Sequence, residues 1–326
     1  MITMITSRIT DLWRFLTLLV RTAPAAVCLL LCGCIFEYPD PSCFEDKTVN
    51  VRFDWSADTT ATPEGMSVLF YPTDGGSYWR FELRKEGGSV RIPDGEYRVL
   101  TFNNDTGTIL FENQDNYGSA LITTRPARLT DGISKTYTGS QPPRRAEEED
   151  QPVITQPDVV WSASAGSFHT ADKPTEIILA PAPMVARYRV IADSVTNIES
   201  ASAVAMAISS LSAGRVLSDG GMIPVDVTVP SAMRRTRMST LEGGLLGFGR
   251  IEDRGQCLLS IYIILRDGSR KLYEYDVTST ISDAPDPLDV EIHVSGLHLP
   301  ETETSGGTGM DVGVDDWDVV EIELST

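Results

Sequence analysis

The chain has 326 residues, of which 41% are apolar and 22% are charged, and its formal net charge is −19. A surface with this excess of acidic residues does not attract nucleic acid or an anionic membrane by charge. The length is sufficient for a targeting segment followed by two domains of ordinary size.

Residues 1–33 have the three parts of a secretory signal: a start that contains three arginines, an apolar run over residues 23–31, and a small residue, Gly33, directly before Cys34. The alternatives are a transmembrane anchor and an ordinary signal peptide that a cysteine follows by coincidence. The apolar run is too short for an anchor, because a bilayer crossing needs about 20 apolar residues. We therefore predict signal cleavage between Gly33 and Cys34.

The four residues Leu31-Cys32-Gly33-Cys34 are typical of a bacterial lipobox. Only a thiol can accept the diacylglyceryl group at this position, and two or more acyl chains hold a protein firmly in its membrane. We expect a mature lipoprotein that begins at Cys34 and is held by its lipid outside the cytoplasm. Residues 34–46, which contain two prolines, are expected to form an extended tether.

Two cysteines remain after the signal and the lipid acceptor, Cys43 and Cys257. They are candidates for a disulfide in an oxidising compartment, although sequence alone does not establish the required geometry. The alternative for Cys257, which lies in a run typical of a strand, is a small buried apolar residue. Both interpretations stay open at this point.

The first half of the mature chain shows one strand pattern after another. Residues 49–55 alternate apolar and polar side chains, which is typical of a half-buried strand. Pro93-Asp94-Gly95 marks a turn, since proline presets φ and glycine permits a positive φ. Further strands are expected within residues 66–71, 78–83, 89–92, 97–102, 108–111, 120–124 and 159–161.

Residues 139–156 differ from their surroundings. They contain Arg144, Arg145 and four consecutive acidic residues at 147–150, a composition that predicts a solvated surface loop. The dibasic pair could be a protease target, but the simpler interpretation is a plain charged loop.

The second half continues the β pattern, with strands expected over residues 176–181, 186–191, 290–294 and 312–324. Residues 193–211 are the one candidate helix, because apolar residues recur there at helical spacing. Residues 258–265 and 271–277 flank Asp267-Gly268, which predicts a hairpin with a type I′ turn. Short strands with frequent turns predict an all-β protein built of β-sandwiches.

Candidates for chemistry are few. The three histidines, His169, His293 and His298, have no spacing typical of a metal site, and the acidic residues near 311–318 lack the spacing of a calcium loop. Paired carboxylates for glycoside hydrolysis remain open because their separation is spatial, yet no pair stands out. We therefore predict no catalytic residues, no metal, no cofactor and no enzymatic activity.

Aromatic residues gather in residues 71–81, namely Tyr71, Tyr78, Trp79 and Phe81. An exposed platform of such rings could stack on sugars. The alternative is core packing, since aromatic residues are common in strands.

The order of several motifs resembles one known family. These are residues 51–55, 65–72, 92–100, 102–105, 156–163, 289–297 and 309–317. Together they resemble Bacteroidales lipoproteins of unassigned function, which are similar to the fimbrillin superfamily of type V pilins with their anchor and accessory subunits.

The resemblance implies two tandem transthyretin-like β-sandwich domains, expected here at 47–170 and 171–326. It implies an outer-membrane lipoprotein, exposed at the cell surface, that anchors or accompanies a fimbria-like assembly and binds fimbrial subunits by β-strand addition. Stalk pilins of that superfamily lose their first strand to an Arg-specific protease. No arginine lies between Cys34 and Arg52, which favours an anchor or accessory subunit. The alternative function is a carbohydrate-binding surface lipoprotein of a polysaccharide-uptake system.

Overall fold

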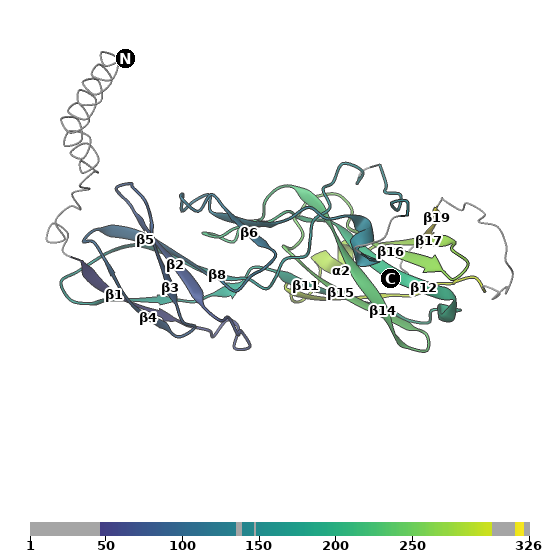
Figure 1. Cartoon of the computed structure of the whole chain (residues 1–326), viewed down its shortest axis with the longest axis horizontal. Helices are drawn as coiled ribbons and strands as arrows, with labels where there is room; N and C mark the ends of the chain where they lie inside the picture. The colour runs from purple at the N-terminus through teal and green to yellow at the C-terminus, as the bar shows by residue number, and fades with distance from the viewer. Residues whose placement is uncertain (1–45, 135–138, 147, 302–316, 323–326) are drawn as a thin grey trace, which may run out of the picture. The chain divides into compact units, whose positions relative to one another are not determined.

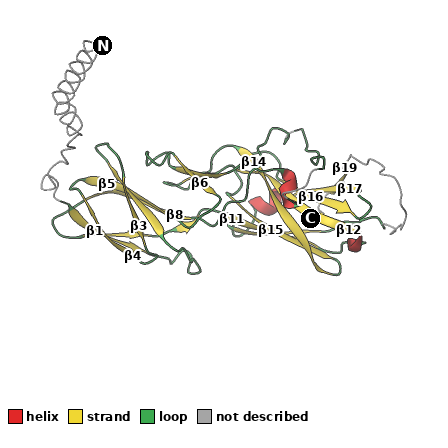
Figure 2. Cartoon of the chain, viewed as in Figure 1, coloured by secondary structure: helices red, strands yellow, loops and turns green. Residues whose placement is uncertain are grey.

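The computed structural model describes residues 46–134, 139–146, 148–301 and 317–322. Strands dominate these ranges, as Figures 1 and 2 show. This confirms the predicted all-β class and its β-sandwich architecture. Within the described ranges no helix combines the length and the hydropathy that a bilayer crossing requires.

Two sheets enclose the first core. The smaller sheet has the order β4-β1-β9, and the larger one has the order β10-β8-β5-β2-β3. Their strands are β1 (Lys47–Phe53), β2 (Met66–Pro72), β3 (Trp79–Leu83), β4 (Gly87–Ile92), β5 (Glu96–Asn103), β8 (Trp161–His169), β9 (Thr175–Leu179) and β10 (Ala182–Pro183). Apolar residues of both sheets, among them Val49, Phe70 and Val99, form one buried cluster between them.

Strand β9 follows residue 170 in the chain, yet it pairs in parallel with β1. Strand β10 also follows this position and pairs antiparallel with β8. The first sandwich therefore uses residues on both sides of the expected domain boundary, and the boundaries themselves stay a prediction.

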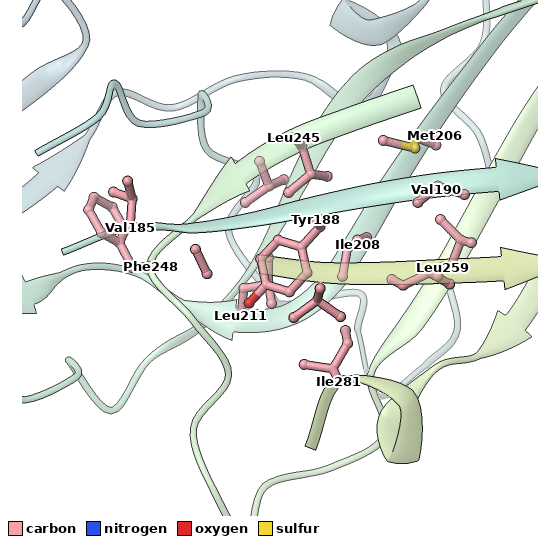
Figure 3. Close-up of a cluster of buried hydrophobic side chains, with 14 of the residues drawn as sticks. Val185, Tyr188, Val190, Met206, Ile208, Leu211, Leu245, Phe248, Leu259 and Ile281 are labelled. Carbon is pink, nitrogen blue, oxygen red and sulfur yellow. The ribbon is translucent and has the colours of Figure 1, made fainter. Parts of the chain in front are cut away.

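The second core is formed mainly by an eight-stranded sheet of order β18-β11-β15-β14-β12-β16-β17-β19, together with residues of β2 and β5 such as Leu69 and Leu100. The strands are β11 (Ala186–Ala192), β12 (Ala201–Ser212), β14 (Asp226–Arg237), β15 (Thr240–Gly247), β16 (Leu258–Leu265), β17 (Arg270–Asp276), β18 (Asp289–Val294) and β19 (Trp317–Ile322). Figure 3 shows Tyr188, Ile208 and Leu259 from three of these strands pointing into the same apolar cluster. The short elements η3 (Ile198–Ser200) and α2 (Thr278–Ser282) connect strands.

A fourth sheet, of order β13-β7-β6, joins distant parts of the sequence. It consists of β6 (Ile109–Glu112), β7 (Leu121–Thr124) and β13 (Arg215–Val216). Arg215 and Val216 pair with Ile122 and Leu121, more than 90 residues earlier in the chain. The helical turn η2 (Leu129–Gly132) follows β7 and contacts β14 and β12.

The expected helix over residues 193–211 is wrong. The structure has η3 there, followed by strand β12, which pairs with β14 on one side and β16 on the other. Residues 205–212 of β12 are all buried, so both faces of the strand are covered. Apolar residues on both faces of a buried strand can imitate helical spacing by coincidence, and the tertiary environment decides the outcome.

The expected hairpin is confirmed as β16 and β17, which pair from Leu258↔Asp276 to Ile264↔Arg270. Its turn differs from the expected type I′, which requires a positive φ at two central residues. Here only Gly268 has a positive φ (88°), and its N–H donates to the carbonyl of Leu265 at 3.1 Å. The turn is therefore a three-residue loop whose glycine forms the bulge.

Candidate functional site

The predicted lipidation and cleavage residues, Cys34 and Gly33, lie outside the described residues. So does Cys43, the expected partner of Cys257. Cys257 directly precedes β16 in the chain and is fully buried. Its thiol lies 3.0 Å from the carbonyl oxygen of Ser209. Burial raises the pKa of this thiol strongly, so it stays protonated. Its disulfide with Cys43 stays a prediction.

The first described strand, β1, is the middle strand of its sheet. It pairs with β4 over Lys47–Arg52 and with β9 over Val49–Phe53. The alternating residues Val49, Val51 and Phe53 are at most 5% exposed and fill the first core. Both edges of β1 are therefore hydrogen-bonded, and its inner face is buried. Removing it would leave an apolar groove in the sandwich.

Arg52, the first arginine after Cys34, lies within β1. Its side chain is exposed, and its Nε lies 3.7 Å from Glu176 of β9. The peptide bond after Arg52 is part of the β1–β9 ladder, in which Phe53 pairs with Leu179. A protease needs an extended, unpaired segment in its cleft, so this site is protected while the sandwich is folded.

The two ends of the eight-stranded sheet approach each other beside the segment that follows β18. Tyr273 and Tyr275 of β17 donate their hydroxyls to the carbonyls of His298 (2.8 Å) and Ser295 (3.2 Å). A groove of about 600 Å³ lies here, lined by Lys271, Tyr273, Gly296, His298, Leu299, Pro300, Val320 and Ile322. We call it the edge groove. It is largely apolar and adjoins an edge strand, which are features that suit a further strand.

Strand β19 forms one border of the edge groove. It pairs in parallel with β17 from Trp317↔Arg270 to Ile322↔Tyr275, and its other edge has no strand partner among the described residues. Its inward residues Val320 and Ile322 pack on the second core, whereas Val319 on the opposite face is 44% exposed.

The segment expected to be a solvated loop is instead attached to the eight-stranded sheet. Residues 139–146 and 148–151, which we call the strap, lie against β12, β14 and β17. Arg144 donates to the carbonyl of Gln151 (2.7 Å) and to the hydroxyl of Thr228 (2.8 Å). Arg145 forms ion pairs with Glu274 at 2.9 Å and Glu321 at 3.3 Å. The dibasic pair therefore holds the strap in place.

The aromatic residues do not form a single platform. Tyr71 is 5% exposed and belongs to the second cluster, with the Tyr78 ring 5.4 Å away. Trp79 and Phe81 lie on the opposite face of β3, where Phe81 packs on Phe70 of the first core. Core packing therefore explains most of this group, and the carbohydrate-binding alternative receives no support from it.

The histidines lie apart and are exposed: His169 is in β8, His293 is in β18 and His298 borders the edge groove. Across the described ranges, no three His, Cys, Asp or Glu side chains are grouped so that they could hold a metal ion. Asp318 pairs with Lys271 of β17, and the acidic residues expected beside it at 311–316 lie outside the described residues.

Comparison with known proteins agrees with the fold. Residues 38–231 match the family model described as domain of unknown function DUF5119. The chain belongs to this family. The match begins before β1 and ends within β14, so it includes the whole first sandwich and the strap.

Individual relatives carry names from fimbriae and adhesion. A Bacteroides ovatus protein named "Putative fimbrium anchoring subunit Fim4B" is 32% identical over 95 residues, which is 27% of each chain. The alignment thus spans about a quarter of that relative's length. A crystal structure of a "putative adhesin" from the same species has a TM-score of 0.63 at 17% identity, covering 81% of this chain and 95% of that one. Another "putative adhesin", from Bacteroides thetaiotaomicron, has a TM-score of 0.51 at 11% identity, covering 77% and 92%.

These similarities confirm the resemblance drawn from the ordered motifs. Sequence reasoning missed two features, the edge groove and the attachment of the strap. The groove is made of residues from β17, β19 and the segment after β18, which no local pattern connects. For the strap, the two arginines amid acidic residues could equally have indicated ion pairing with the rest of the protein.

Proposed function

We propose that the chain is a non-enzymatic anchor or accessory subunit of a fimbria-like assembly, held at the outer membrane by lipid on Cys34. The observation that carries this proposal is the position of β1, which is hydrogen-bonded on both edges and buried on its inner face. A subunit that keeps this strand also keeps its connection to Cys34 and hence to the membrane. The fimbrial and adhesin names of its relatives point the same way.

The proposed partner is a fimbrial subunit that contributes a β-strand. Main-chain hydrogen bonds to an edge strand would supply affinity, and side-chain pockets would supply specificity. The edge groove suits this role because one edge of β19 pairs with no other described strand and Tyr273, Val320 and Ile322 offer apolar surface. The first sandwich offers no comparable place around β1, since β4 and β9 occupy both of its edges.

Membrane attachment is tested by Cys34→Ala. We expect the variant to leave the membrane fraction, because it lacks the thiol that accepts the lipid, while Cys43→Ala, the matched control, stays there. Quantitative immunoblots of membrane and soluble fractions provide the measurement. Retention of Cys34→Ala in the membrane would contradict lipid anchoring.

The partner site is tested by replacing Pro300, an exposed residue of the edge groove, with photoreactive benzoylphenylalanine. Illumination of intact cells should cross-link this variant to a fimbrial subunit, identified by mass spectrometry. The control carries the same group at Met238, which is 85% exposed in the turn between β14 and β15. Equal cross-linking from both positions would contradict the assignment of the edge groove.

A further inference from the structure

A small polar cavity lies under the strap. Its volume is about 230 Å³, and it lies where the strap meets β12, the start of β14 and the start of β16. It is lined by Arg145, Glu148, Gln151, Ser210, Asp226, Gly255, Gln256 and Leu258. The cavity is separate from the edge groove, with which it shares no lining residue.

Two carboxylate oxygens of the residues that line this cavity have no hydrogen-bond donor in the described part of the chain. Glu148 is 6% exposed, and no described residue donates to its Oε1; the same holds for Oδ1 of Asp226. Buried polar atoms in folded proteins nearly always have a partner, because an unmade hydrogen bond in a dry environment costs free energy. Each oxygen therefore needs a partner from outside the described chain.

The nearby arginines do not donate to these two oxygens. Arg145 binds Glu274 and Glu321, and Arg144 binds the carbonyls of residues 149 and 151. Arg254 lies 3.9 Å from the other oxygen of Asp226. The acidic groups around the cavity are Glu148, Asp226, Glu274, Asp276 and Glu321. The basic groups are Arg144, Arg145, Arg254 and Arg250, which donates to the carbonyl of the lining residue Gly255. Acidic groups therefore outnumber basic groups by one.

Neutral oxygen atoms complete the lining. The hydroxyl of Ser210 donates to the carbonyl of Gln256 at 2.8 Å and accepts from the amide nitrogen of Gln151 at 3.2 Å, which leaves it one lone pair. Gln151 and Gln256 contribute amide oxygens, of which that of Gln151 also accepts from the N–H of Ser210 at 3.1 Å. Carboxylates together with neutral oxygens are the ligands of hard cations. Ca²⁺ accepts six to eight oxygens in irregular geometry, whereas Mg²⁺ requires a near-ideal octahedron.

We propose that this cavity binds one Ca²⁺ ion through the carboxylates of Glu148 and Asp226, with neutral oxygens of the lining as further ligands. Such a site has only two carboxylates, so it differs from the grouping of three or more ionisable ligands that the described residues lack. A bound ion would join the strap to the start of β14. It would therefore fix the strap over the sheet beside the Arg145 ion pairs.

The proposal is tested on the full mature protein, dialysed against EDTA and then titrated with CaCl₂. We expect heat of binding in calorimetry and a rise in Tm of roughly 3–6 °C at 5 mM CaCl₂, because a ligand that binds only the folded state stabilises it by mass action. NaCl at the same ionic strength serves as the salt control. An equal rise with NaCl, or none with CaCl₂, would overturn the proposal.

Variants identify the ligands. Glu148→Gln and Asp226→Asn should each weaken Ca²⁺ binding at least tenfold and remove most of the Tm rise. Glu149→Gln and Asp150→Asn change the charge identically at exposed neighbouring positions and should bind Ca²⁺ like the unaltered protein. Full Ca²⁺ binding by both Glu148→Gln and Asp226→Asn would overturn the site. If either variant fails to fold, the other and the two controls still decide the matter.

Discussion

Arg145 Nε lies 2.9 Å from Oε2 of Glu274, a carboxylate whose side chain is only 4% exposed. The pair joins the strap to the middle of β17. Arg145 also reaches Glu321 of β19, so one guanidinium connects the strap, β17 and the last described strand. A surface ion pair contributes little to stability, but a buried carboxylate depends on its partner.

Replacing Arg145 by methionine should therefore destabilise the protein by about 2–4 kcal/mol, because it leaves the charge of Glu274 buried and unpaired. The double variant Arg145→Met with Glu274→Met should recover most of this loss, since neither charge then remains. Urea unfolding of the single and double variants gives the comparison. A single variant as stable as the unaltered protein would mean that the strap is not attached through this pair.

The close packing of β1 against β4 is tested at Gly87 of β4, which pairs with Arg52 of β1. Gly87 has φ = 106°, and a Cβ there would lie 2.0 Å from the carbonyl oxygen of Val51. Gly87→Ala should cost about 3 kcal/mol or more, since it combines backbone strain with a clash against β1. Gly75→Ala is the control, because Gly75 has a similar φ of 96° but open space around it, and should cost about 1 kcal/mol. Equal losses in thermal unfolding would argue against the close contact between β4 and β1.

Strand β19 provides a paired test on adjacent residues. Val320 packs on the second core, whereas Val319 faces outward. Val320→Asp should destabilise the protein by about 2–3 kcal/mol, because it places a carboxylate among apolar groups, and Val319→Asp should change stability by less than about 0.5 kcal/mol. Guanidinium unfolding distinguishes the two, and the reverse order would mean that β19 packs with its opposite face.

Glu148 predicts a pH dependence. Burial raises its pKa above the usual value of a glutamic acid. Its protonated form therefore stabilises the fold below the unfolded-state pKa, and this contribution is lost as the pH rises through the folded-state pKa. In EDTA at pH 8, Glu148→Gln should be more stable than the unaltered protein by about 1 kcal/mol, and the difference should shrink as the pH falls toward 4.5. Urea unfolding at several pH values measures it, and a difference that grows on acidification would contradict the raised pKa.

The alternation of apolar and polar residues predicted strands that have one buried face and one face exposed to solvent. Strands β1 and β18 alternate in sequence and in burial, so their assignment needs no tertiary information. The prediction was wrong for residues 201–212. Residues 205–212 of β12 are buried on both faces of the strand, which removes the alternation that identifies a strand. The prediction of a solvated loop was wrong for the strap for another reason. Its charged residues bind partners on β14, β17 and β19, which lie more than 80 positions away in the chain.

The candidate functional sites also differ in how far the sequence predicts them. Local spacing was enough to propose Cys34, because a lipobox is contiguous. The edge groove and the cavity under the strap are formed by residues from at least three separate segments each, so only the folded chain identifies them.

The retention of β1 is the central claim, and intact-mass analysis of the protein purified from the cells that produce it tests it most directly. The account predicts a chain that begins at Cys34, carries the mass of its acyl chains and includes Lys47–Phe53. A chain that begins at Phe53, after cleavage at Arg52, would contradict it.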